Sequence, residues 1–111
     1  MAVQHGVCEF KDDDGGYLAW LSEHRAGFVL NITRSYSAAT AKVHRAECRT
    51  INGKPPRGTT WTGPYVKVCA DSLAELDQKT ISLVGKLILR CRICHPTDSS
   101  AQPVSTKQMR P

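Results

Sequence analysis

The sequence contains no apolar run that approaches the ~18 residues of a membrane-spanning helix. Its N-terminus also has no basic segment followed by an apolar one, so we expect no signal peptide, no membrane partner and a cytoplasmic location. The chain has 111 residues, which suffices for one small domain with a modest core. A core of this size gains from a cross-link such as a metal ion.

Catalytic motifs are also missing. The sequence shows no Ser–His–Asp order, no phosphate-cradling Gly-rich loop and no H-E-x-x-H segment, so it gives no positive indication of an enzyme. The number of cysteines is odd, because the chain contains five. An odd count with a C-x-x-C pair favours thiol or metal chemistry in a reducing compartment, and a disulfide framework is the alternative.

Positive charge is concentrated in one part of the chain. The formal net charge is +5, which favours polyanionic partners. Residues 1–33 carry two basic and five acidic residues, a balance of −3, whereas residues 34–95 carry eleven basic and four acidic residues, a balance of +7. The basic part also contains the His/Cys pairs described below.

The hydrophobic pattern predicts an α+β domain. An acidic start at Asp12–Asp14 and the spacing of apolar residues indicate a helix near residues 17–24, and Ser72 with Glu75 fits a capping box for a helix that ends at Gly85. The remaining predicted elements are strands at 28–32, 41–43, 65–70 and 86–90, a helical turn at 45–51, and a loop at 52–64.

These elements predict a small, mainly antiparallel sheet of three to four strands with two helices, stapled by a zinc knuckle site. We expect residues 1–95 to form one domain and residues 96–111, which are polar and rich in Pro and Ser, to form a disordered tail.

Two residue pairs have the spacing of metal ligands. His44 and Cys48 are four residues apart, on one face if the segment is helical, and Cys91 and Cys94 form a C-x-x-C turn. Three sulfurs and one imidazole suit tetrahedral Zn²⁺ rather than Mg²⁺ or Ca²⁺, and iron–sulfur clusters usually take four thiolates. In the simpler alternative, the three cysteines are small core residues and His44 lies at the surface. Cys69, on a predicted strand, is expected to be buried, with replacement ligand as its alternative.

The segments VHRAECRTI, YVKVCADSLAEL and CRICHP, within residues 43–96, resemble the metal-binding domain of Ada-type DNA repair proteins and its stand-alone relatives. The resemblance implies a zinc site and work on nucleic acid, since similar zinc modules occur in nucleases and DNA-modification proteins. His44 stands where the repair proteins have a methyl-accepting cysteine, and a zinc-bound imidazole is a far poorer methyl acceptor than a zinc thiolate. The spacing from Cys48 to Cys91 is also longer than in that family. The resemblance therefore carries over the metal site and not the repair chemistry.

Basic residues surround the predicted ligands. Since basic side chains contact phosphates and an exposed aromatic ring can stack on a base, we expect a nucleic-acid surface. The candidate contacts are Arg45, Arg49, Lys54, Arg57, Trp61, Arg90 and Arg92. In the alternative, these side chains form a solvated basic surface and Trp61 folds onto the core.

Together these features predict a zinc-stabilised nucleic-acid-binding module, with DNA favoured by the resemblance, accessory to a nuclease or modification enzyme of a restriction, modification or repair system. A protein–protein interaction module with purely structural zinc is the second hypothesis. A hydrolase with an open metal site is the third.

Overall fold

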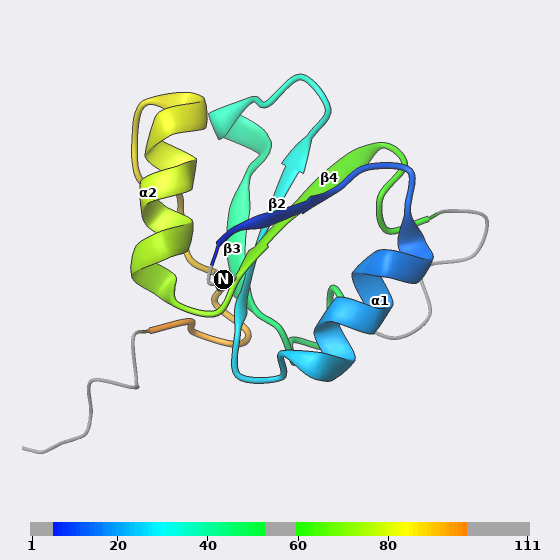
Figure 1. Cartoon of the computed structure of the whole chain (residues 1–111). Helices are drawn as coiled ribbons and strands as arrows, with labels where there is room; N and C mark the ends of the chain where they lie inside the picture. Colours follow the sequence, from blue (N-terminus) through cyan, green and yellow to red (C-terminus); the bar gives the residue numbers. More distant parts are fainter. Residues whose placement is uncertain (1–5, 53–59, 98–111) are drawn as a thin grey trace, which may run out of the picture.

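A four-stranded antiparallel sheet separates two helices in the computed structural model, which describes residues 6–52 and 60–97 (Figure 1). The sheet has the strand order β1-β4-β2-β3. The elements are β1 (Cys8–Phe10), α1 (Asp14–Glu23), β2 (Phe28–Thr33), the 3-10 turn η1 (Ala38–Thr40), β3 (Lys42–Arg45), β4 (Tyr65–Ala70) and α2 (Leu73–Val84). The predicted α+β class, with two helices and an antiparallel sheet, is confirmed.

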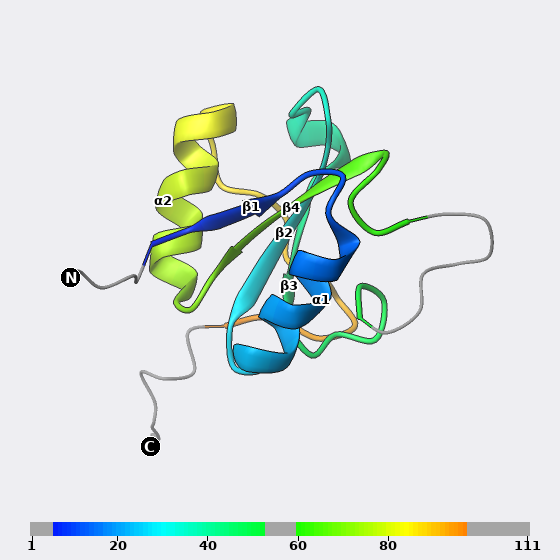
Figure 2. The same ribbon diagram turned by 45° about the vertical axis from the view of Figure 1, so that its right-hand side comes forward.

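The two helices cover opposite faces of the sheet (Figure 2). The cluster under α2 contains Leu76 and Val66, whereas the cluster under α1 contains Tyr17 and Cys69. The predicted strand at residues 65–70 accounts for this division, because successive side chains of a strand point to opposite faces: Val66 and Val68 lie in one cluster and Cys69 in the other. Neither helix of the described chain has the length and apolar character that crossing a bilayer requires.

Local capping explains where the helices begin and end. The Asp13 carboxylate accepts a hydrogen bond from the Gly16 amide at 2.9 Å, and the Ser72 hydroxyl accepts one from the Glu75 amide at 3.1 Å. Gly85 ends α2 with a φ of 83°, a left-handed conformation that glycine adopts without steric cost. The predicted caps of both helices are thus confirmed.

Three local predictions differ from the structure. Strand β1 was not predicted, because three residues are too few to show a strand's alternation of polar and apolar side chains. Its extended conformation is stabilised by pairing with β4. Residues 86–90 do not form a full strand and contribute one isolated parallel bridge, between Val43 and Arg90. Residues 45–51 form two tight turns instead of a helix, with amide-to-carbonyl bonds from Cys48 to Arg45 and from Ile51 to Cys48. Most of the predicted tail, residues 98–111, lies outside the described residues.

Lys67 is buried on the α1 face of the sheet, with 2% of its surface exposed. Its Nζ donates hydrogen bonds to Asn31 Oδ1 and to the Trp61 carbonyl, both at 2.6 Å. The rings of Tyr17, Trp61 and Tyr65 lie between 5.6 and 5.7 Å from the nitrogen, within cation–π range. Burial lowers the pKa of Lys67 to about 8, because a desolvated ammonium is less stable than a hydrated one.

This lowered pKa predicts a pH-dependent contribution to stability. Between about pH 8 and the ordinary lysine pKa of 10.5, the unfolded chain keeps a proton that folded Lys67 has released. Stability therefore rises with pH in this window. We expect the unfolding free energy of the wild type, relative to Lys67→Met, to increase between about pH 7.5 and pH 10 in chemical denaturation. Lys42→Met removes an exposed ammonium and is the matched control, and a pH-independent difference for Lys67→Met would contradict the prediction.

Candidate metal centre

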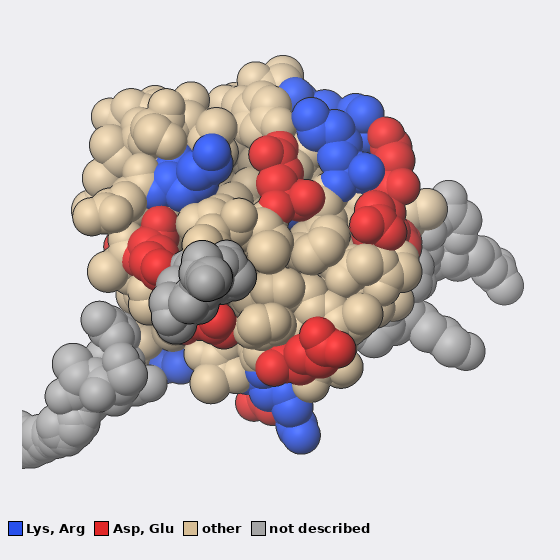
Figure 3. Space-filling model, viewed as in Figure 1, with Lys and Arg blue, Asp and Glu red and all other residues tan. Residues whose placement is uncertain are grey.

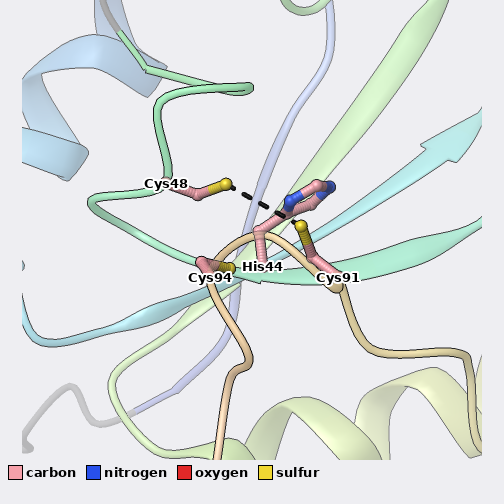
Figure 4. Close-up of side chains that lie close together, drawn as sticks. All are labelled: His44, Cys48, Cys91 and Cys94. Atoms are coloured by element: carbon pink, nitrogen blue, oxygen red, sulfur yellow. Dashed lines mark hydrogen bonds between the residues drawn. The ribbon is translucent and has the colours of Figure 1, made fainter.

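Four side chains from two distant parts of the chain converge at the edge of the sheet (Figure 4). His44 projects from β3 and Cys48 from the turn after it, whereas Cys91 and Cys94 belong to the turn that follows the bridge at Arg90. Their ligand atoms all lie within 4.8 Å of one another. His44, Cys48 and Cys91 are buried, and Cys94 is half-buried. The sequence prediction that these four residues meet is confirmed, and the group is able to hold a metal ion.

The short bridge between β3 and residues 89–91 positions Cys91. The amide of Val43 donates to the carbonyl of Leu89 at 2.9 Å, and the amide of Cys91 donates to the carbonyl of Val43 at 2.8 Å. Because Val43 precedes His44 directly, this pair of bonds brings Cys91 beside the imidazole. Of the strand predicted at 86–90, only the bridge at Arg90 forms, and the C-x-x-C turn follows it directly.

Arg45 holds the C-x-x-C turn in place. Its amide lies 3.1 Å from the Cys94 sulfur, and its guanidinium donates to the carbonyls of Cys94 and His95 at 2.9 and 3.0 Å and to the Thr97 hydroxyl at 3.1 Å. The amide of Ile93 donates to the Cys91 sulfur at 3.3 Å. Such N–H···S contacts stabilise thiolates, which are the ligand form of cysteine.

The distances within the cluster suit a tetrahedral ion. A tetrahedral centre with metal–sulfur bonds of about 2.3 Å places two sulfurs about 3.8 Å apart. The Sγ atoms of Cys48 and Cys91 are 3.9 Å apart. Thr50 adds a contact that the sequence analysis missed, since its hydroxyl lies 3.0 Å from Cys48 Sγ and 3.4 Å from His44 Nδ1. The position of Thr50, two residues after the candidate ligand Cys48, was the feature of the sequence that could have indicated this contact.

The surroundings of His44, Cys91 and Cys94 shift their pKa values in different directions. Burial, with smaller contributions from Lys42 and Lys67, lowers the pKa of His44 to about 4, so the imidazole is in its neutral, metal-binding form near pH 7. Burial raises the pKa of the Cys94 thiol, and its cysteine neighbours raise it further. Burial opposes ionisation of Cys91 as well, but hydrogen bonds from the amides of Cys94 and Ile93 bring its pKa below the usual value. Three thiolates this close repel one another, and a divalent cation removes that repulsion.

The side chains predicted to contact nucleic acid differ in whether they already bond to other parts of the protein. Arg45 is committed to the C-x-x-C turn, and Arg90 forms a bidentate ion pair with Asp77, with N–O distances of 2.8 and 2.7 Å. Arg49 and Arg92 are exposed and form no hydrogen bond or ion pair with any described residue. Lys54 and Arg57 lie outside the described residues.

Trp61 requires a correction. It is 8% exposed and packs in the cluster under α1, so it is the buried ring of the alternative interpretation and not an exposed stacking platform. Cys69 is fully buried, as expected, and is not part of the four-residue group. Cys8 is exposed on the edge strand β1.

No protein-family model, no curated protein and no solved structure matches the chain significantly. The resemblance to the Ada-type metal-binding domain therefore depends on the short sequence motifs within residues 43–96 alone. The structure supports its coarser part, a Cys₃His group that could hold a metal.

The geometry predicts one metal ion per chain and a dependence of the fold on it. Cys94→Ser should lose the metal and the cooperative thermal transition, because apparent binding energies of structural sites reach roughly 10 kcal/mol or more. Cys8→Ser removes an exposed cysteine outside the group and is the matched control, which should keep both. Elemental analysis by mass spectrometry and circular-dichroism melting measure the two effects. A metal-free wild type that still melts cooperatively would contradict the prediction.

Proposed function

We propose that this chain is a zinc-stabilised nucleic-acid-binding module. The choice of zinc is supported by the donor set, because three cysteine sulfurs and one imidazole within 4.8 Å of one another suit tetrahedral Zn²⁺. Oxygen-preferring Mg²⁺ and Ca²⁺ do not suit these soft ligands, and iron–sulfur clusters usually use four thiolates. Four protein ligands fill the tetrahedral positions, which favours a structural ion over a hydrolytic one.

The observation that supports nucleic-acid binding is a pair of exposed arginines beside the candidate ligands, neither of which bonds to another described residue. Arg49 follows Cys48 and Arg92 follows Cys91, and the sulfurs of these two cysteines are 3.9 Å apart. Two exposed guanidiniums therefore start from adjacent turns, which like-charge repulsion disfavours in the absence of an anion. Phosphate oxygens are suitable partners because guanidinium forms bidentate hydrogen bonds with them.

The distribution of charged side chains indicates which surface a polyanion would contact. On the face seen in Figure 3, basic groups are separated by acidic ones, a pattern typical of a solvated surface. Asp12, which lies outside residues 34–95, pairs with Arg34 and offsets one unit of their +7 balance. Arg90 is held by Asp77, whose charge that balance already includes. The contact surface that we propose is therefore the edge bearing Arg49 and Arg92. DNA as the target, and an accessory role beside a nuclease or modification enzyme, follow from the resemblance and belong to the same proposal.

A protein–protein interaction module with structural zinc is the second candidate. Leu87, Leu89 and Ile93 are 56%, 76% and 54% exposed, and they lie close together in the sequence around the bridge at Arg90. Exposed apolar groups of this kind are typical of protein contact surfaces. Such a surface would bind with little dependence on salt, in contrast to a phosphate-binding one.

The double variant Arg49→Glu/Arg92→Glu separates these candidates. We expect it to weaken binding to nucleic acid and to reduce the salt slope by about one unit for each lost phosphate contact. Titrations of single- and double-stranded DNA and RNA at several salt concentrations measure both quantities.

Lys79→Glu/Lys86→Glu changes the net charge equally, on and just after α2, and is the matched control that should bind nearly as the wild type does. Both variants must retain the metal content of the wild type. Equal loss in the two variants would indicate a general charge effect, and no loss in either would favour the protein-interaction candidate.

A further inference from the structure

A pocket of about 350 Å³ lies directly beside the candidate metal centre. Small-molecule sites commonly range from roughly 300 to 1,000 Å³, so this pocket has the size for a small organic group. Its wall includes the ligands His44 and Cys91 and also Thr50, which contacts two of the metal-binding atoms. Any group that occupies the pocket would therefore contact the metal centre's own residues.

The strand register explains how the pocket wall is built. Asn31 pairs with Lys42 on one side and with Lys67 on the other, so these three residues form a polar row across β3, β2 and β4. The neighbouring rows hold His44 opposite Val29 and Tyr65 opposite Thr33. Because paired residues of antiparallel strands point to the same face, all of these side chains lie on the α1 face of the sheet.

The charged side chain that lines this pocket is basic, and a second basic side chain lies close by. Lys42 is exposed and lines it, and Lys67 is held beneath it by its bond to Asn31 Oδ1. Lys42 lines the pocket together with His44, and Lys67 lies one strand beyond Asn31 in the same polar row. None of the described residues that line the pocket carries a carboxylate. These charges suit an anion such as a phosphate.

The pocket also offers contacts for a planar, hydrogen-bonding group. Tyr65 is 37% exposed and Ile93 is 54% exposed, and both line the pocket. An ammonium can only donate hydrogen bonds, so Asn31 must present its oxygen to Lys67, which leaves its amide NH₂ as a donor. Tyr65 thus provides, in this pocket, the exposed aromatic surface that the sequence analysis assigned to Trp61.

We propose that the pocket binds one nucleoside phosphate unit, namely an unpaired nucleotide of a nucleic-acid strand, with its base against Tyr65 and Ile93 and its phosphate at Lys42. The inference rests on the proposed function and deepens it, since Arg49 and Arg92 would contact neighbouring phosphates. A base inside an intact duplex has both faces stacked and cannot enter. The module should therefore prefer single strands, or duplexes with an unpaired base, over fully paired ones.

The probe is an oligonucleotide with 2-aminopurine at a single position, whose fluorescence reports a change in stacking. It is used as a single strand, as a duplex with that base unpaired, and as a fully paired duplex. We expect tighter binding of the first two. Tyr65→Leu and Lys42→Gln should each weaken that binding about fivefold or more, since one stacked base contributes roughly 1–3 kcal/mol.

Matched variants keep this test specific. Tyr65→Phe keeps the ring and should bind within about twofold of the wild type, whereas Tyr65→Leu keeps apolar volume without it. Lys86→Gln removes a lysine outside the lining of this pocket and should change nothing. Metal content and thermal unfolding of every variant should match the wild type, which separates lost binding from lost folding.

The outcomes distinguish this inference from the proposed function. If Arg49→Glu/Arg92→Glu weakens binding but Tyr65→Leu and Lys42→Gln do not, the pocket proposal is wrong and the proposed function stands. Free nucleoside monophosphate, titrated by NMR, tests the other source of the same chemistry. Binding of the free nucleotide without binding of any strand would assign the pocket to a small molecule and overturn both the strand proposal and the proposed function. Binding of neither would overturn both proposals as well.

Discussion

Two backbone hydrogen bonds hold the candidate metal centre together before any ion is considered. They join Val43 of β3 to Leu89 and Cys91, and they bring the C-x-x-C turn next to His44. The bidentate pair of Arg90 with Asp77 ties the same segment to α2, and Arg45 ties the following turn to β3. The position of Cys91 and Cys94 relative to His44 and Cys48 therefore depends on this contact between the edge strand β3 and residues 89–91.

The parts of the structure that sequence reasoning predicted are those governed by neighbouring residues. The caps at Asp13 and Ser72, the alternation of β4 and the ligand spacing all act over a few residues. The roles of Arg45 and Arg90 could not be predicted in this way, because their partners lie 49 and 13 residues or more away along the chain. Trp61 shows the same difficulty, since whether a ring is buried depends on which helix packs over it.

The α1 face of the sheet combines an apolar half with a polar half. Near α1, Val29 and Cys69 pack under Tyr17, whereas toward β3 the polar row of Asn31 and Lys42 lies next to His44 of the candidate metal centre. Lys67 lies at the boundary, and its hydrogen bonds and ring contacts compensate a cation that would otherwise be costly to bury. A polar site can persist on a sheet face this small because each polar atom has a partner. Among the described residues, no buried side-chain nitrogen or oxygen lacks one.

The separation of Cys48 and Cys91 by 43 positions gives a bound ion a topological role. An ion that bridges them closes a ring of chain that contains β4 and α2, while β1, α1 and β2 lie outside it. Closing a ring costs entropy that grows only slowly with its length, by about 0.6 kcal/mol for each doubling. The segment between β3 and β4 can therefore change in length at little thermodynamic cost, as long as the ion keeps the ring closed. Variation in length between related chains should accumulate there, because lengthening this segment enlarges the ring at little cost in closure entropy.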